Sequence, residues 1–151
     1  MPSAQTPTIS IFLTFENTAE EAMDFYLSLF DDATITNVIR AQPGEPGWAV
    51  NTLQHAIFSF GGQHFMAINA PPPGARGSDH GPWHEFGFTP AIALYVQCGT
   101  EEEIQRLYDA LSEKGEIFMP LGDYGFSRRF AWVNDRFGVS WRLNVSGDSP
   151  R

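Results

Sequence analysis

Apolar residues recur with helical spacing in two segments of the chain, residues 18–30 and 100–112. Each segment starts with a threonine that is followed three residues later by a glutamate, a pairing typical of a capped helix N-terminus. Beyond the cap, apolar positions follow i, i+3, i+4 and i+7, which places them on one helical face. These positions are Ala22, Phe25, Tyr26 and Leu29 in the first segment and Ile104, Leu107, Tyr108 and Leu111 in the second. The pattern predicts two helices that pack alike.

Strand-like runs flank both predicted helices in the same order. A short run rich in β-branched and aromatic residues precedes each helix, at 9–15 and 91–98, and we match Ile11 with Ile92 across the repeat. Three further runs follow each helix: 33–40, 48–60 and 63–69 after the first, and 116–121, 126–133 and 139–145 after the second. The order βαβββ therefore occurs twice, which predicts an α+β protein whose helices cover one face of antiparallel-rich sheets.

Turn residues set the boundaries of these elements. Gly61 and Gly62 predict a tight hairpin in the first half, and Lys114 and Gly115 predict the end of the second helix. Residues 70–89 contain three consecutive prolines and several glycines, so we interpret them as a linker. The chain is then expected to form one domain, 1–151, with a first module at about 8–69 and a second at about 90–146.

Charge and cysteine content narrow the classes of partner. The formal net charge is −9, which argues against nucleic acid and anionic membranes, because both require surfaces rich in Lys and Arg. The single cysteine, Cys98, cannot form an internal disulfide, and it is expected to be a small buried apolar residue. The first residues lack a basic start and an apolar stretch, and no run is long enough to span a bilayer. We therefore expect a cytoplasmic protein without membrane contacts.

Four stretches, in order along the chain, carry a family resemblance. They are residues 12–30, 62–69, 86–89 and 132–141. Together they resemble the PhnB-like branch of the vicinal-oxygen-chelate superfamily, which includes glyoxalase, bleomycin-resistance and extradiol dioxygenase proteins. Members of this branch are often labelled 3-demethylubiquinone 3-methyltransferase-like. The resemblance implies two βαβββ modules whose curled mixed sheets enclose a cleft, commonly in a homodimer.

The same resemblance indicates where a metal would be held. In metal-dependent members of the superfamily, ligands come from strands one, four, five and eight, and this chain has Ser10, Asn69, Ala91 and Arg142 at those positions. Ala91 offers no ligand atom, and the cationic Arg142 would repel a metal ion. We therefore expect no metal. We also expect no nucleotide-like cofactor, because no predicted strand leads through a Gly-rich turn into a helix.

Histidines suggest two further sites. His80, His84 and Glu85 lie within a few residues of one another, and either bind a metal or belong to a solvated loop. His55 and His64 lie on opposite arms of the predicted hairpin, so they are expected to face each other across strands as a surface pair.

Period-two alternation separates the strand faces. Ile11, Leu13, Ile92, Leu94 and Val96 are expected to meet the helices. The residues expected to line the cleft are Ser10, Phe12, Thr14, Asn69, Ala91, Tyr95 and Arg142. This set favours metal-free binding of a small, partly apolar molecule, with a homodimer as the expected assembly. The alternatives are an enzyme with a non-standard site, using Asp123, Tyr124 or the linker histidines, and a structural or regulatory dimer with a vestigial cleft.

Arg142 sharpens this hypothesis, because a guanidinium facing an apolar cavity requires an anionic partner. Candidates within the chain are Asp123, Asp135 and Glu85, all on predicted loops. The other candidate is the carboxylate or phosphate of a bound ligand.

Overall fold

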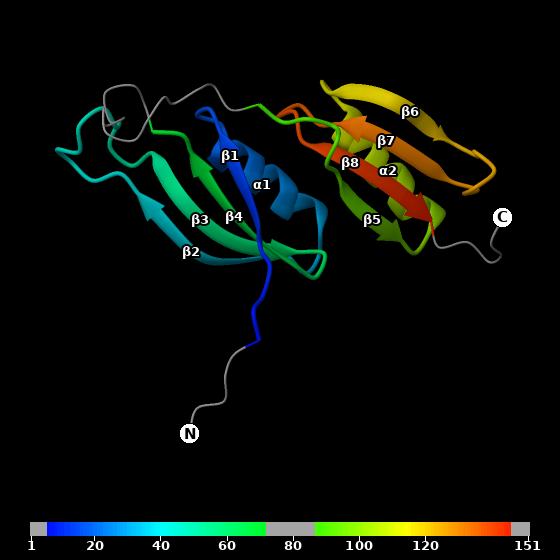
Figure 1. The fold of residues 1–151 in the computed structure, drawn as a ribbon, viewed down its shortest axis with the longest axis horizontal. Helices are drawn as coiled ribbons and strands as arrows, with labels where there is room; N and C mark the ends of the chain where they lie inside the picture. Colours follow the sequence, from blue (N-terminus) through cyan, green and yellow to red (C-terminus); the bar gives the residue numbers. More distant parts are fainter. Residues whose placement is uncertain (1–5, 72–86, 146–151) are drawn as a thin grey trace. The chain divides into compact units, whose positions relative to one another are not determined.

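The computed structural model describes residues 6–71 and 87–145, and the chain divides into two compact units, Met1–Phe86 and Gly87–Arg151. The described residues of each unit form one helix and one four-stranded sheet (Figure 1). The first unit comprises β1 (Ile11–Phe15), α1 (Ala19–Leu29), β2 (Thr34–Arg40), β3 (Leu53–Phe60) and β4 (Gln63–Asn69). The second comprises β5 (Leu94–Cys98), α2 (Glu101–Ser112), β6 (Glu116–Gly122), β7 (Phe130–Asn134) and β8 (Ser140–Val145).

The two sheets have the same topology. Strand order is β1-β4-β3-β2 in the first and β5-β8-β7-β6 in the second. In each sheet, the strand before the helix runs parallel to the last strand of the unit, and the other pairs are antiparallel. Both sheets are mixed and open, with two edge strands each. The predicted α+β duplication of βαβββ is therefore confirmed, while a cleft between the modules stays a prediction.

The helices bury one face of each sheet, as the helical spacing predicted. In the first unit, α1 packs on β3 and β4 through residues that include the fully buried Tyr26. Phe58, Phe60 and Phe65 stack beneath it, with the Phe60 and Phe65 ring centroids 4.3 Å apart. In the second unit, the buried residues of α2 are Ile104, Leu107 and Leu111, and they meet a sheet face built on Trp141 and Leu143. Each sheet therefore has one face that the helix covers, filled by buried aromatic and aliphatic side chains, and one open face that no helix covers.

Strand pairing corrects the expected match between the two modules. β1 and β4 pair from Ile11 with Phe65, and β5 and β8 pair from Leu94 with Trp141. Ile11 therefore corresponds to Leu94, and the match with Ile92 was wrong. Pro90 lies in a turn in which the Ile92 N–H donates to the Thr89 carbonyl at 3.3 Å. Because of this turn, β5 begins only at Leu94. Ile92 consequently remains 74% exposed rather than packed under a helix.

Other strands are also shorter than predicted. β3 begins at Leu53 instead of Trp48, because residues 48–52 form turns, with Asn51 in the left-handed region at φ 72°. β7 begins at Phe130 rather than Phe126. The Gly61–Gly62 hairpin is confirmed, with φ values of 58° and 77°.

The helix termini differ from prediction in two places. Thr100 caps α2, its Oγ1 accepting from the Glu103 N–H at 3.1 Å, but Thr18 makes no side-chain cap. At the end of α2, Lys114 rather than Gly115 takes the left-handed conformation, with φ 59°. Gly115 is needed for space instead, because a Cβ there would lie 2.1 Å from the Asn134 carbonyl oxygen.

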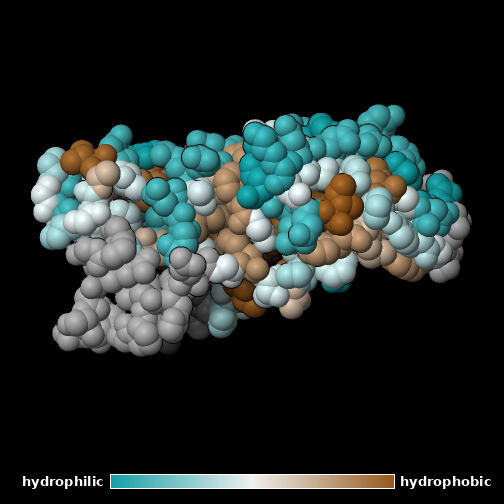
Figure 2. All heavy atoms as spheres, turned by 90° about the horizontal axis from the view of Figure 1, so that it is seen from above, coloured by the Kyte–Doolittle hydropathy of each residue, from teal (hydrophilic) through white to brown (hydrophobic). Residues whose placement is uncertain are grey.

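Neither helix of the described residues is long and apolar enough to cross a membrane. Apolar side chains nevertheless reach the surface in both units, seen as brown atoms among the teal in Figure 2. The expected cytoplasmic location stays a prediction.

Candidate functional site

Arg142 lies on the open face of the second sheet, between two aromatic neighbours. On β8 it is in register with Tyr95 of β5 on one side and with Trp132 of β7 on the other. Its guanidinium carbon stands over the Trp132 ring, 4.2 Å from the centroid, a cation–π contact. Tyr95 is 59% exposed. We call these three residues the Arg142 face.

The Trp132 ring is fixed by its surroundings. Its Nε1 donates to Ser140 Oγ at 2.8 Å, and Ser140 is itself buried. The Phe118 ring lies 5.0 Å away at 44°. A hydrogen bond at one edge and a ring contact at another hold the indole in one orientation, so it offers Arg142 a rigid platform.

Within the described ranges, Arg142 has no carboxylate partner, and its buried Nε has no hydrogen bond. Of the acids expected to pair with it, Asp135 is used elsewhere: it accepts from Val139 N at 3.0 Å and from Trp141 Nε1 at 2.9 Å. The Asp123 carboxylate accepts from Gly125 N at 2.9 Å within its own turn. Glu85 lies outside the described residues. The internal ion pair is thus absent from the part of the chain that the structure describes.

The first sheet carries two of the expected cleft residues on its open face. Phe12 is 52% exposed on β1, and Thr14 follows on the same side. Ser10 is exposed just before β1, and Ala91 is exposed in the turn before β5. The structure therefore groups Phe12 with Thr14, and Tyr95 with Arg142.

Asn69 lies on the other, helix-covered side of its sheet. It is 5% exposed, and its side chain accepts from Ala19 N at 2.9 Å and donates to the Leu53 carbonyl at 2.9 Å. This amide supplies the cap that Thr18 does not make. By strand register Asn69 corresponds to Val145, not to Arg142. Its position is explained by the structure of the first unit without any ligand.

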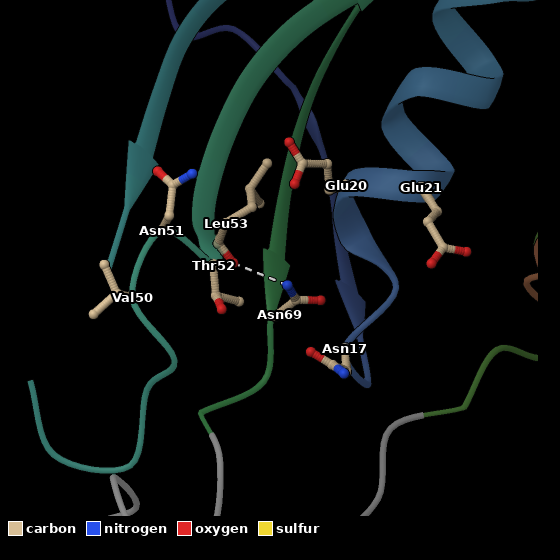
Figure 3. A pocket seen from close by; sticks show the side chains of 8 residues that line it. All are labelled: Asn17, Glu20, Glu21, Val50, Asn51, Thr52, Leu53 and Asn69. Atoms are coloured by element: carbon tan, nitrogen blue, oxygen red, sulfur yellow. Dashed lines mark hydrogen bonds between the residues drawn. The ribbon is translucent and has the colours of Figure 1, made fainter. Parts of the chain in front are cut away.

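A small cavity opens beside Asn69 in the first unit (Figure 3). Its volume is about 350 Å³, and its lining residues are Asn17, Glu20, Glu21, Val50, Asn51, Thr52, Leu53 and Asn69. Arg40 donates to both carboxylate oxygens of Glu20, at 3.1 and 2.5 Å, and this contact lowers the pKa of Glu20. Amides, a hydroxyl and carboxylates suit a polar neutral or cationic group better than an anion. Helical and strand periodicity gave no signal for this cavity, because turn residues build much of its wall.

The donor set does not suit the metal of the superfamily. Asn69 is committed to backbone groups, Ala91 has no donor, and Arg142 is cationic. Across residues 6–71 and 87–145, no three His, Cys, Asp or Glu side chains are placed to hold one ion. His80, His84 and Glu85 lie outside those ranges, so that cluster stays a hypothesis.

Two other expectations about reactive side chains have clear outcomes. Cys98 is 1% exposed, and burial raises the pKa of its thiol to about 11, as expected for a small buried residue. His55 and His64 do not face each other: His55 is in register with Ile68, and His64 with Ser59. The two-residue turn sets this register, which places the histidines at different heights on the hairpin.

The sequence of this chain matches the family described as 3-demethylubiquinone-9 3-methyltransferase over residues 7–144. Protein YjdN of Escherichia coli (strain K12) is 30% identical over 98 residues, which cover 65% of this chain and 59% of that protein. A putative 3-demethylubiquinone-9 3-methyltransferase, PhnB protein, from Bacillus cereus is 45% identical, with a TM-score of 0.80, covering 93% of this chain and 100% of that one. A glyoxylase/bleomycin resistance protein/dioxygenase domain from Frankia sp. EAN1pec shares the fold, with a TM-score of 0.59 at 10% identity, covering 97% of this chain and 96% of that one.

Proposed function

This chain belongs to the 3-demethylubiquinone-9 3-methyltransferase family, on the glyoxalase/bleomycin-resistance fold, and from this premise we propose that it binds a small, partly apolar organic anion without a metal. Arg142 holds the anionic group, and the aromatic rings of the Arg142 face contact the apolar body. The observation that carries the proposal is a guanidinium stacked on Trp132 with no carboxylate partner among the described residues.

Electrostatics favour an anionic ligand at this position. Stacking on an indole lowers the exposure of the guanidinium to water but does not neutralise its charge, and no carboxylate of the described ranges pairs with it. Arg binds carboxylate and phosphate groups through paired N–H donors, and such bonds are stronger than those between neutral groups. Because Nε is buried, the terminal nitrogens are the atoms that meet the anion. Tyr95 and Trp132 then favour an aromatic or aliphatic acid over inorganic phosphate.

Methyl transfer has less support from the residues of this chain. The turns that link β1 to α1 and β5 to α2 are Glu16–Thr18 and Gly99–Thr100, and neither resembles the Gly-rich turn that cradles a nucleotide-like cofactor. Two of the acid–base candidates make local hydrogen bonds, since Tyr124 donates its hydroxyl to the Pro120 carbonyl at 2.5 Å and Asp123 accepts from Gly125, while the linker histidines lie outside the described residues. These contacts favour binding over catalysis by that turn.

The test is a thermal-shift series in the presence of a metal chelator. Phenylacetate and phenylphosphonate are compared with neutral 2-phenylethanol on wild type, on Arg142→Met and on Arg106→Met. Arg106 is exposed on α2, so its variant controls for loss of one positive charge. At about 100 times its dissociation constant, a ligand adds about 2.7 kcal/mol of stability, a readily measured shift.

We expect the acids to stabilise wild type and Arg106→Met, and to have little effect on Arg142→Met. The neutral alcohol should affect the three proteins alike. Equal stabilisation of all three proteins by the acids, or of none, would contradict the proposal.

We also propose that the chain forms a homodimer. The edge strands β2 and β6 expose Ile39 and Ile117, at 48% and 47%, and apolar edge strands are prone to pair with another chain. Sedimentation should show twice the monomer mass at micromolar concentration. A monomer alone would contradict this assembly.

A further inference from the structure

His55 is an imidazole on the open face of the first sheet that none of the contacts above explains. It lies on β3 between Ile39 of β2 and Ile68 of β4, and its ring centroid is 6.3 Å from that of Phe12. Its neighbours Ala56 and Phe58 are buried, as expected for strand residues that alternate towards the helix. His55 is therefore a polar ring in apolar surroundings.

The two ring nitrogens of His55 differ in environment. Nδ1 is enclosed and has no hydrogen-bond partner in the described part of the chain. Nε2 is not enclosed, and no described residue bonds to it. A buried N–H without an acceptor is disfavoured more strongly than a buried lone pair without a donor. The proton is therefore expected on Nε2, where it can still reach an acceptor.

We propose that His55 carries its ring proton on Nε2, and that this N–H donates to the carbonyl oxygen of a small uncharged ligand on the open face of the first sheet. Phe12 and Ile68 supply apolar contact for the rest of the ligand. The chemistry required is one acceptor oxygen on an uncharged apolar body. The proposal stands independently of the Arg142 site, because it involves a different donor on the other module and a ligand without charge.

The matching position of the second module provides a natural comparison. His55 faces Ile68 as Phe130 faces Asn144, and each pair lies two residues along the strands from the pair that contains Met66 or Arg142. A phenylalanine is thus compatible with this point of the fold. His55→Phe removes the donor while keeping a planar ring, and His64→Phe, on the exposed part of the same hairpin, is its matched control.

The first test is the ¹⁵N spectrum of the imidazole rings at neutral pH, without ligand. We expect Nε2 of His55 to show the shift of a protonated nitrogen and Nδ1 that of an unprotonated one. His64, which is exposed, should show values averaged between the two tautomers. Averaged values for His55 as well, or a proton on Nδ1, would overturn the tautomer and with it the proposed donor.

The second test uses acetophenone, a neutral aromatic ketone, and ethylbenzene, which lacks the oxygen. Acetophenone should displace the His55 Nε2 resonance in wild type, in His64→Phe and in Arg142→Met. It should bind His55→Phe about fivefold to tenfold more weakly, the loss expected for one hydrogen bond. Ethylbenzene should bind wild type and His55→Phe alike. Equal binding of acetophenone to wild type and His55→Phe would overturn the proposal, whatever the outcome at Arg142.

Discussion

The open faces of the two sheets have the same geometry and different chemistry. In the first sheet, Met66 lies in register between Phe12 and Ile57, and in the second sheet Arg142 lies in register between Tyr95 and Trp132. One trio is apolar, and the other holds a cation on an indole. The duplicated fold thus sets the positions of the side chains on each open face, and the residue types at those positions determine what each module can bind.

The helix-covered sides differ as well. Thr100 caps α2 from the adjacent residue, whereas α1 is capped by Asn69, which comes from the last strand of its unit. The first helix therefore depends on tertiary structure for a contact that the second makes locally.

The largest effect is expected from Asn69→Val, which installs the residue found at the matching position, Val145. The Ala19 N–H and the Leu53 carbonyl would both lose a buried partner. We expect the free energy of unfolding to fall by about 2–4 kcal/mol, from the cost of two unpaired polar groups. Chemical denaturation measures this change. A loss below about 0.5 kcal/mol would show that the distant cap contributes little to stability.

A smaller effect is expected from removing the local cap. Thr100→Ala should lower the free energy of unfolding by about 1 kcal/mol, the usual value for an N-cap hydroxyl. Thr18→Ala is the matched control, since Thr18 makes no cap, and it should change stability by less than about 0.5 kcal/mol. Equal losses of unfolding free energy in Thr100→Ala and Thr18→Ala would contradict the conclusion that only α2 has a local threonine cap.

Trp132→Ile replaces the indole that Arg142 stacks on with the residue type found at the matching position of the first sheet, Ile57. Loss of the cation–π contact should weaken phenylacetate binding by about 0.5–1 kcal/mol. Isothermal titration calorimetry measures the affinity, and 2-phenylethanol serves as the neutral reference. Unchanged affinity for the acid would mean that the indole does not support the cation.

The smallest effect concerns Asp32, which holds the hairpin turn of the first unit. Its carboxylate accepts from the N–H groups of Gly61 and Gly62, and these bonds lower its pKa from the ordinary value of 3.8. A lowered folded-state pKa means that this stabilisation is present above pH 3.8 and is lost as the pH falls through the folded value. Wild type should exceed Asp32→Asn in urea stability at pH 7, and this difference should shrink as the pH falls below 3.8; a difference of constant size would contradict this.

Much of the fold could be predicted from the sequence, because it rests on local signals. Helical spacing located both helices, and Gly61–Gly62 located a hairpin. The first residues of the strands were harder to predict from the sequence. The turn around Pro90 excludes Ile92 from β5, although the residue type suits a strand.

The candidate site was only partly predictable. Alternation along β5 and β8 brought Tyr95 and Arg142 to one face, and the structure places them in register. Asn69 was assigned to the cleft from the family resemblance, but its side chain is directed to α1, where it accepts from the Ala19 N–H, 50 residues away in sequence. Trp132 falls within the predicted strand 126–133, but its contact with Arg142 was missed, since that contact depends on cross-strand register.

Native mass spectrometry of the protein purified from its own host distinguishes a chain that binds an organic anion from one that binds a metal. We predict that wild type carries a small organic anion and no stoichiometric divalent metal, and that Arg142→Met loses the anion. One divalent metal ion per chain, retained in Arg142→Met, would contradict metal-free binding at Arg142.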